Sequence, residues 1–105
     1  MFTIDFHKNA VKEIKKLPYS LQVETMSLIS LLRTEGHQLG LPHSRAMKDG
    51  LFELRASAKD GIARSLYFFQ KGKKIYVLHV FQKKTQQTPE QNLALARKRK
   101  KEVEE

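Results

Sequence analysis

The order of apolar and polar residues near the N-terminus predicts one strand and one helix. Phe2, Ile4 and Phe6 alternate with polar residues, which is typical of a short, half-buried strand. From His7 to Leu17 the apolar side chains recur every three or four residues, and lysines occupy most of the other positions. This spacing predicts an amphipathic helix with a basic outer face that ends near Pro18, because proline cannot continue the helical hydrogen bonding.

A second helix is expected from Ser20 to Glu35, and Gly36 provides a C-terminal stop. The two helices would form a hairpin. The segment 36–50 contains three glycines and Pro42 without clear periodicity, so we expect a loop there. The apolar face of the second helix is expected to consist of Leu21, Met26, Leu28, Ile29, Leu31 and Leu32.

Three strands are expected in the second half of the chain, at about Leu51–Ala56, Ile62–Gln70 and Lys73–Phe81. Turn signals at Asp60-Gly61 and Lys71-Gly72 separate them, which predicts an antiparallel meander. The last two strands are apolar at both odd and even positions. Such a pattern indicates central strands that are covered on both faces of the sheet.

A C-terminal helix is predicted after the meander. Thr88 is suited to the N-cap, Pro89 to the first helical position and Gln91 to the third. The fold class that follows is α+β, with an antiparallel sheet of about four strands in a single domain of residues 1–105. The residues of this last helix that we expect to face the core are Leu93, Ala94 and Ala96.

Composition narrows the class of protein. The chain has 105 residues and no cysteine, which excludes a disulfide framework and thiol catalysis. The N-terminal residues contain no long apolar run, so we expect a soluble, cytoplasmic protein with no membrane partner. The formal charge of +9 favours an anionic partner. The basic helix end at about 97–105, with five consecutive cations in 97–101, is either a solvated helix terminus or a clamp for RNA or an acidic protein.

The candidate chemistry lies at the ends of the predicted meander. RNA can be cut without a metal when its own 2′-hydroxyl attacks the adjacent phosphate, and cations then stabilise the charged transition state. Arg64 is the first candidate for this stabilisation, because a guanidinium can bind two phosphate oxygens. Glu53 and Arg55 share one strand face, so they form either a structural ion bridge or a couple in which Glu53 is the general base. Lys83 and Lys84 are suited to binding phosphate.

Aromatic residues and histidines offer further candidates. Tyr67 and Phe81 either stack on an RNA base or belong to the core. His79 is interpreted as a hydrogen-bonded core residue, although a histidine acid is an alternative. None of the histidines has the spacing of a metal pair, so no metal or cofactor is expected. The other three are His7, His37 and His43.

Four segments in this order carry a resemblance to a known family: Gly50–Arg55, Ile62–Tyr67, His79–Thr85 and Thr88-Pro89. They resemble the HigB-like, phage-related branch of the RelE/ParE toxin superfamily. The resemblance implies a RelE-like fold and the toxin half of a type II toxin–antitoxin pair, most often an endoribonuclease that cuts mRNA on the translating ribosome. It also implies a cognate antitoxin, usually a helix-turn-helix protein of the HigA type.

The resemblance also implies site residues. Arg55 and Arg64 match basic active-site positions of RelE-type toxins, and Lys83 with Lys84 matches the basic pair after their last strand. Glu53 departs from the RelE pattern, where lysine is usual, but glutamate at this position is similar to the HigB-like branch. Two other functions stay open, namely a ParE-like inhibitor of DNA gyrase and a nucleic-acid-binding protein without enzymatic activity.

Overall fold

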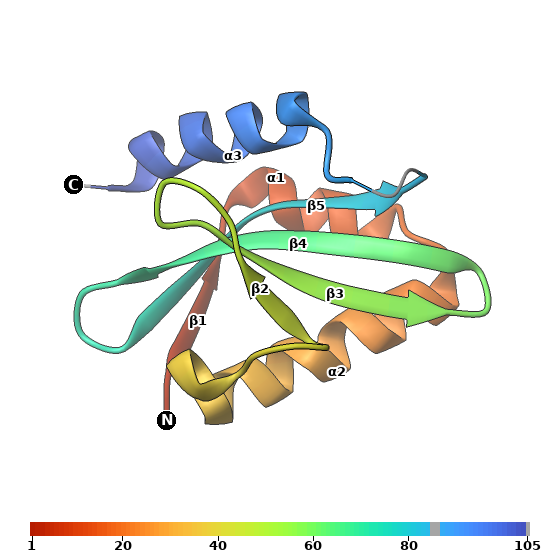
Figure 1. Ribbon diagram of the computed structural model, residues 1–105, viewed down its shortest axis with the longest axis horizontal. Coiled ribbons are helices and arrows are strands. Elements are labelled where there is room, and N and C mark those ends of the chain that lie inside the picture. The colour runs from red at the N-terminus through yellow and green to blue at the C-terminus, as the bar shows by residue number, and fades with distance from the viewer. Residues whose placement is uncertain (85–86, 105) are drawn as a thin grey trace.

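The computed structural model describes residues 1–84 and 87–104 and consists of a five-stranded sheet with helices on both faces (Figure 1). Thr85, part of a predicted motif, and Glu105, part of the predicted basic end, lie outside the described residues. The strand order is β1-β5-β4-β3-β2. The elements are β1 (Thr3–Phe6), α1 (Lys8–Lys15), α2 (Tyr19–Glu35), a 3-10 turn (Gly36–Gln38), β2 (Ser44–Ala46), β3 (Phe52–Ala58), β4 (Gly61–Gln70), β5 (Lys74–Lys83) and α3 (Glu90–Val103).

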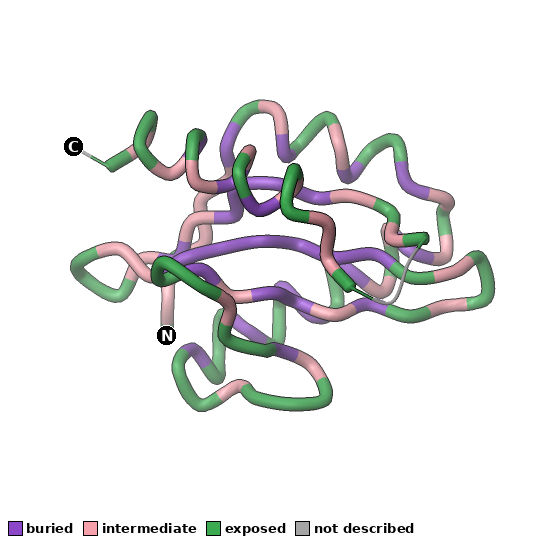
Figure 2. Tube along the Cα trace, turned by 45° about the horizontal axis from the view of Figure 1, so that its top comes forward, coloured by how far each residue is buried: buried purple, intermediate pink, exposed green. Residues whose placement is uncertain are grey.

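Two apolar clusters hold the layers together. The larger one joins α1 and α2 to one face of the sheet, and the smaller one joins α3 to the other face. The strands β4 and β5 are therefore covered on both sides, as their apolar pattern predicts, and buried segments follow them through the middle of the molecule (Figure 2). The α+β architecture expected from the sequence is confirmed.

The sheet differs from the predicted one in two respects. It has five strands rather than about four, because residues 44–46 in the expected loop form the edge strand β2, which pairs with β3. A three-residue strand is too short to show a periodic pattern. The sheet is also mixed rather than purely antiparallel, because β1 pairs with β5 in parallel after the chain crosses through both helices.

Parts of the helix predictions were wrong. Met26 and Leu31 are 47% and 36% exposed, because α2 buries a narrower stripe than we expected. In α3, Ala94 is exposed, whereas Arg99 of the basic run is buried in line with Leu93 and Ala96. Residue 88 is not the N-cap, since α3 begins at residue 90 and its cap is proline without a side-chain hydrogen bond.

A β-bulge in β5 changes the direction of its side chains. Leu66 pairs with His79 whereas Tyr67 pairs with Val77, so Leu78 is the additional residue. His79 consequently does not share the side of Val77, although their sequence parity is the same.

A buried polar cluster joins α1, β5 and α3 around the carboxylate of Glu13. Arg99 Nη1 donates to Glu13 Oε1 at 2.9 Å, and the Val80 amide donates to the same oxygen at 3.0 Å. His79 lies 3.0 Å from this carboxylate through Nδ1 and 2.8 Å from Asn92 Oδ1 through Nε2. The cluster therefore fixes α3 against β5.

A second contact joins the two helices, because His7 Nε2 donates to Glu102 Oε1 at 2.8 Å. Within residues 1–84 and 87–104, no helix is long and apolar enough to cross a membrane.

Candidate functional site

Four cations meet on the part of the sheet that α3 leaves uncovered. Helix α3 packs over the half of the sheet toward the β4–β5 hairpin, where its apolar residues contact the smaller cluster (Figure 1). Four cations beyond the first turn of α3 are close enough to influence one another electrostatically. They are Arg45 of β2, Arg55 of β3, Arg64 of β4 and Lys83 of β5. We call these residues together with Glu53 the cationic cluster.

The strand register explains this arrangement. Arg45 pairs with Glu53, Arg55 pairs with Arg64, and Arg64 in turn pairs with Phe81. Because paired residues point to the same face of a sheet, these side chains line up across the strands. Three members of the cationic cluster border a hollow of about 200 Å³, which is lined by Arg45, Met47, Glu53, Lys83, Gln87 and Thr88.

Arg64 is the most deeply placed of the cations, at 5% exposure. Its Nη1 donates to the carbonyl of Ala63 at 3.0 Å. Its Nε lies 3.6 Å from Glu53 Oε1 and has no hydrogen-bond partner among the described protein residues. A buried donor without a partner costs about 1–3 kcal/mol, and the charge of Glu53 opposite Nε offsets part of this cost.

Glu53 is 2% exposed and both of its oxygens are engaged. Thr88 donates its hydroxyl to Oε2, and Arg64 faces Oε1. The predicted ion bridge between Glu53 and Arg55 is therefore not formed in the described part of the chain. A carboxylate with so little exposure is also poorly placed to take a proton from a substrate. Its contacts instead hold Arg64 and the segment before α3 in place.

Lys83 and the arginines carry a concentrated positive charge. Burial, followed by the charge of Arg64, lowers the pKa of Lys83, while Glu53 partly opposes this shift. The pKa of Arg64 is also lowered, first by burial and then by Arg55 and Arg45. Within the described residues, Arg45, Arg55 and Lys83 have no ion-pair partner, which leaves their charges available to a bound anion.

The two aromatic candidates, Tyr67 and Phe81, differ in their burial. Tyr67 is 1% exposed, packs in the larger apolar cluster and lies with its hydroxyl 2.5 Å from that of Ser44, so it cannot stack on a base. Phe81 is half-buried beside Arg64 and stacks on His79 with ring centroids 5.0 Å apart. Lys84 is exposed next to the cluster.

The interpretation of His79 as a hydrogen-bonded core residue is confirmed by its contacts with Glu13 and Asn92. His7 caps α1 by accepting a hydrogen bond from the Asn9 amide. His37 stacks on Phe69. None of these histidines belongs to the cationic cluster, and the described residues contain no group of three or more potential metal ligands of the His, Cys, Asp or Glu type.

Two members of the site were not predicted from the sequence. Arg45 was missed because its strand lies in a segment without periodicity, and only its basic character could have indicated it. Thr88 was assigned to a helix cap, whereas its hydroxyl binds Glu53 instead.

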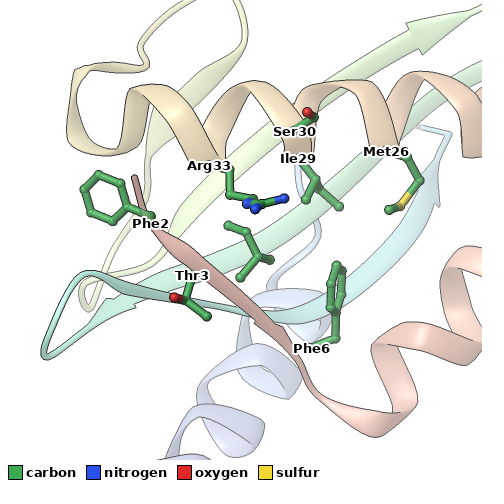
Figure 3. Close-up of a pocket in the computed structure, with 8 residues that line it drawn as sticks. Phe2, Thr3, Phe6, Met26, Ile29, Ser30 and Arg33 are labelled. Carbon is green, nitrogen blue, oxygen red and sulfur yellow. The ribbon is translucent and has the colours of Figure 1, made fainter.

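A second hollow of different character lies between β1 and α2. It has a volume of about 390 Å³, and Met26, Ile29 and Arg33 of α2 point toward Phe2 and Phe6 across it (Figure 3). A smaller apolar hollow adjoins it next to α1 and shares two of these residues with it. With one arginine at its edge, this region lacks the chemistry of a phosphate site.

Comparison with solved structures shows that the fold is that of RelE toxins. The structure resembles a free, doubly mutated E. coli toxin RelE with a TM-score of 0.65 and 19% identity, over 93% of this chain and 96% of that one. It resembles the toxin–antitoxin complex RelBE2 from Mycobacterium tuberculosis with a TM-score of 0.61 and 21% identity, over 78% and 98% of the two chains. The RelE-RelB complex from Pyrococcus horikoshii gives 0.52 and 22%, over 77% and 93%.

Sequence comparison then defines the family. The profile described as "Phage derived protein Gp49-like (DUF891)" matches residues 12–101, so the chain belongs to this family. No curated protein sequence gives a significant match.

Proposed function

We propose that this protein is the toxin of a type II toxin–antitoxin pair and a metal-independent endoribonuclease that cuts mRNA on the translating ribosome. The cationic cluster carries the proposal: four positive charges from four strands share a site with one carboxylate, which leaves a net charge of +3. Such a site is suited to a phosphate group that gains negative charge in the transition state. The RelE-like fold supports it, because the structurally similar proteins are toxins, free or in complex with an antitoxin.

The reaction would use the RNA's own 2′-hydroxyl. Its oxygen bonds to the adjacent phosphorus and loses its proton, the bond from phosphorus to the 5′-oxygen breaks, and that oxygen gains a proton. The products are a 2′,3′-cyclic phosphate and a 5′-hydroxyl. Arg64 would donate an N–H of its guanidinium to a phosphate oxygen, and Arg55 would bind another. Both interactions strengthen as negative charge accumulates on the phosphorane.

Lys83 is our choice for the general base. Its pKa is lowered, so a larger fraction of this amine is neutral near pH 7 than in a free lysine, and it borders the hollow from the end of β5. Glu53 would act as a positioning residue that orients Arg64, rather than as the base. Lys84 would bind a neighbouring phosphate, and Phe81 would stack on a base at the exposed part of its ring.

The proposal includes a cognate antitoxin. Two of the similar structures are complexes of a toxin with its antitoxin. We propose a helix-turn-helix antitoxin of the HigA type, which follows from placing this chain in the HigB-like branch on the basis of Glu53. The apolar hollows beside β1 have the composition of a protein-binding surface.

The test is to map the 5′ ends of a defined message in a reconstituted bacterial translation reaction, with and without ribosomes. Wild type should cut only when ribosomes are present. The cleavage rate of Arg64→Ala should be lower by about a hundredfold or more, as expected for the loss of one transition-state donor. The control Lys59→Ala removes an exposed cation of the β3–β4 turn and should retain full activity.

Each alternative function has its own outcome in this experiment. Intact messages together with trapped gyrase–DNA complexes would indicate a ParE-like toxin. RNA binding without any product would indicate a simple nucleic-acid-binding protein, and cuts without ribosomes would indicate a free ribonuclease.

A further inference from the structure

The outer face of α1 carries a continuous row of lysines. Lys8, Lys12, Lys15 and Lys16 are all exposed. At 3.6 residues per turn, these four positions fall within an arc of about 100° around the helix axis. We call these four residues the lysine stripe.

No carboxylate within residues 1–84 and 87–104 forms an ion pair with the lysine stripe. The one acidic residue of α1, Glu13, is turned inward, where it binds His79 and Arg99. In the part of the chain that the structure describes, none of the four lysines has an ion-pair partner. Like charges three or four residues apart repel each other on a helix surface, so the free protein maintains an unfavourable arrangement that a polyanion would relieve.

Helix α3 extends the same surface. The contacts from Arg99 to Glu13 and from His7 to Glu102 hold α3 beside α1, and both helices follow β5 (Figure 1). Lys98 is exposed one turn before Glu102 and acts on its charge. Glu102 in turn binds His7, the residue before Lys8.

The composition of this surface favours nucleic acid over protein. Protein interfaces are depleted in lysine and enriched in aromatic residues and arginine, whereas lysines contact the phosphate backbone without reading sequence. Lysines four residues apart on a helix are separated by about 6 Å along its axis, so the stripe extends over about 12 Å. An RNA helix presents several phosphates over such a length, because a duplex carries one charge per about 1.7 Å in the B-DNA geometry.

We propose that the lysine stripe is a second RNA-binding surface that takes the phosphate backbone of folded, double-helical RNA, as the ribosome exposes it. Helix α1 covers the face of the sheet opposite to the cationic cluster, so one RNA can occupy the stripe while another enters the site. The choice of ribosomal RNA rests on the proposed function, whereas the binding of double-helical RNA does not.

The test uses a quadruple variant in the Arg64→Ala background, in which cleavage during the binding measurement is slowed about a hundredfold. Binding to an RNA duplex of about 16 base pairs and to purified ribosomes is measured between about 50 and 300 mM salt. Phosphate contacts weaken steeply over this range of salt concentration. The salt slope on the duplex should fall by about 0.9 for each lysine removed, hence by about 3 to 4 in total. The four changes are Lys8→Gln, Lys12→Gln, Lys15→Gln and Lys16→Gln.

A matched control loses the same charge elsewhere on the surface. It should retain the salt slope of the parent within about one unit, since its lysines lie outside the stripe. Glutamine keeps the helix propensity of lysine, and circular dichroism verifies that both variants are folded. The control changes are Lys48→Gln, Lys59→Gln, Lys71→Gln and Lys73→Gln.

The outcomes separate this inference from the proposed function. Loss of duplex binding in the stripe variant alone supports the inference, even if the wild type cuts no RNA. If the wild type cuts, the stripe variant with native Arg64 should show a raised KM on ribosomes and an unchanged kcat. Equal losses in both quadruple variants would show a mere effect of net charge and overturn the inference. Intact RNA binding with lost antitoxin binding would also overturn it and assign the surface to a protein.

Discussion

The carboxylate of Glu13 offers a prediction about stability that follows from its contacts. Burial alone would raise the pKa of Glu13, but hydrogen bonds from His79, Arg99 and the Val80 amide outweigh it and lower the pKa from 4.5 to about 2. One pKa unit corresponds to about 1.36 kcal/mol, so the shift is worth about 3 kcal/mol. The side chain is 21% exposed, and solvent screening reduces this to about 2 kcal/mol.

The sign of the pH dependence follows from the direction of the shift. A carboxyl group with a lowered pKa in the folded state stabilises the fold above the pKa of the unfolded state. This contribution should be complete above about pH 5 and should disappear as the pH falls from 4.5 toward about 2. The substitution Glu13→Gln keeps the shape of the side chain but leaves the buried charge of Arg99 without its partner.

Urea unfolding monitored by circular dichroism at several pH values measures both effects. At pH 7, Glu13→Gln should lower the free energy of unfolding by about 2–3 kcal/mol, the range expected when a partly buried pair loses one member. As the pH falls below 4.5 the variant and the wild type should approach each other, and they should converge only below about pH 2. The control Glu35→Gln removes an exposed carboxylate from the end of α2 and should follow the wild type. A loss below about 0.5 kcal/mol at pH 7, or parallel curves down to pH 3, would refute the reasoning.

Three further predictions concern the fold and the site. Gly36→Ala should destabilise the protein by about 2–4 kcal/mol in urea unfolding, because φ is +53° and a Cβ would lie 1.9 Å from the Phe2 ring; no measurable change would contradict the packing. Thr88→Val should lower kcat about tenfold with little change in KM, since Glu53 loses its hydroxyl donor, and Thr88→Ser should restore the rate. The single-turnover cleavage rate should rise with pH as neutral Lys83 accumulates and level off below the pKa of a free lysine; Lys83→Arg should abolish this limb, and an unchanged profile would exclude the role of base.

The main elements of the fold could be predicted from the sequence because their patterns are local. The alternation in β1, the apolar runs in β4 and β5 and the helical spacing in α1 depend on neighbouring residues alone. Strand β2 could not be found in this way, because three residues carry no period and their pairing partner lies in β3. The parallel pairing of β1 with β5 is likewise a property of the tertiary fold.

The site was predictable only in part for a similar reason. The sequence indicated basic residues on three neighbouring strands, and the antiparallel register brings Arg64, Arg55 and Lys83 together. Which carboxylate faces which arginine depends on diagonal contacts between strands, so Glu53 meets Arg64 rather than Arg55. Buried polar contacts such as the one between Arg99 and Glu13 join helices that are far apart in the sequence, and a run of basic residues gave no sign of them.

The central claim is that the cationic cluster stabilises the attack of an RNA 2′-hydroxyl on its own phosphate. The most direct measurement is single-turnover cleavage, on ribosomes, of a message that carries one 2′-deoxynucleotide at the mapped cutting position. The account predicts no cut at that position, and a 2′,3′-cyclic phosphate on the product of the unmodified message. An undiminished cut in the modified message, or a product with a 5′-phosphate, would contradict it.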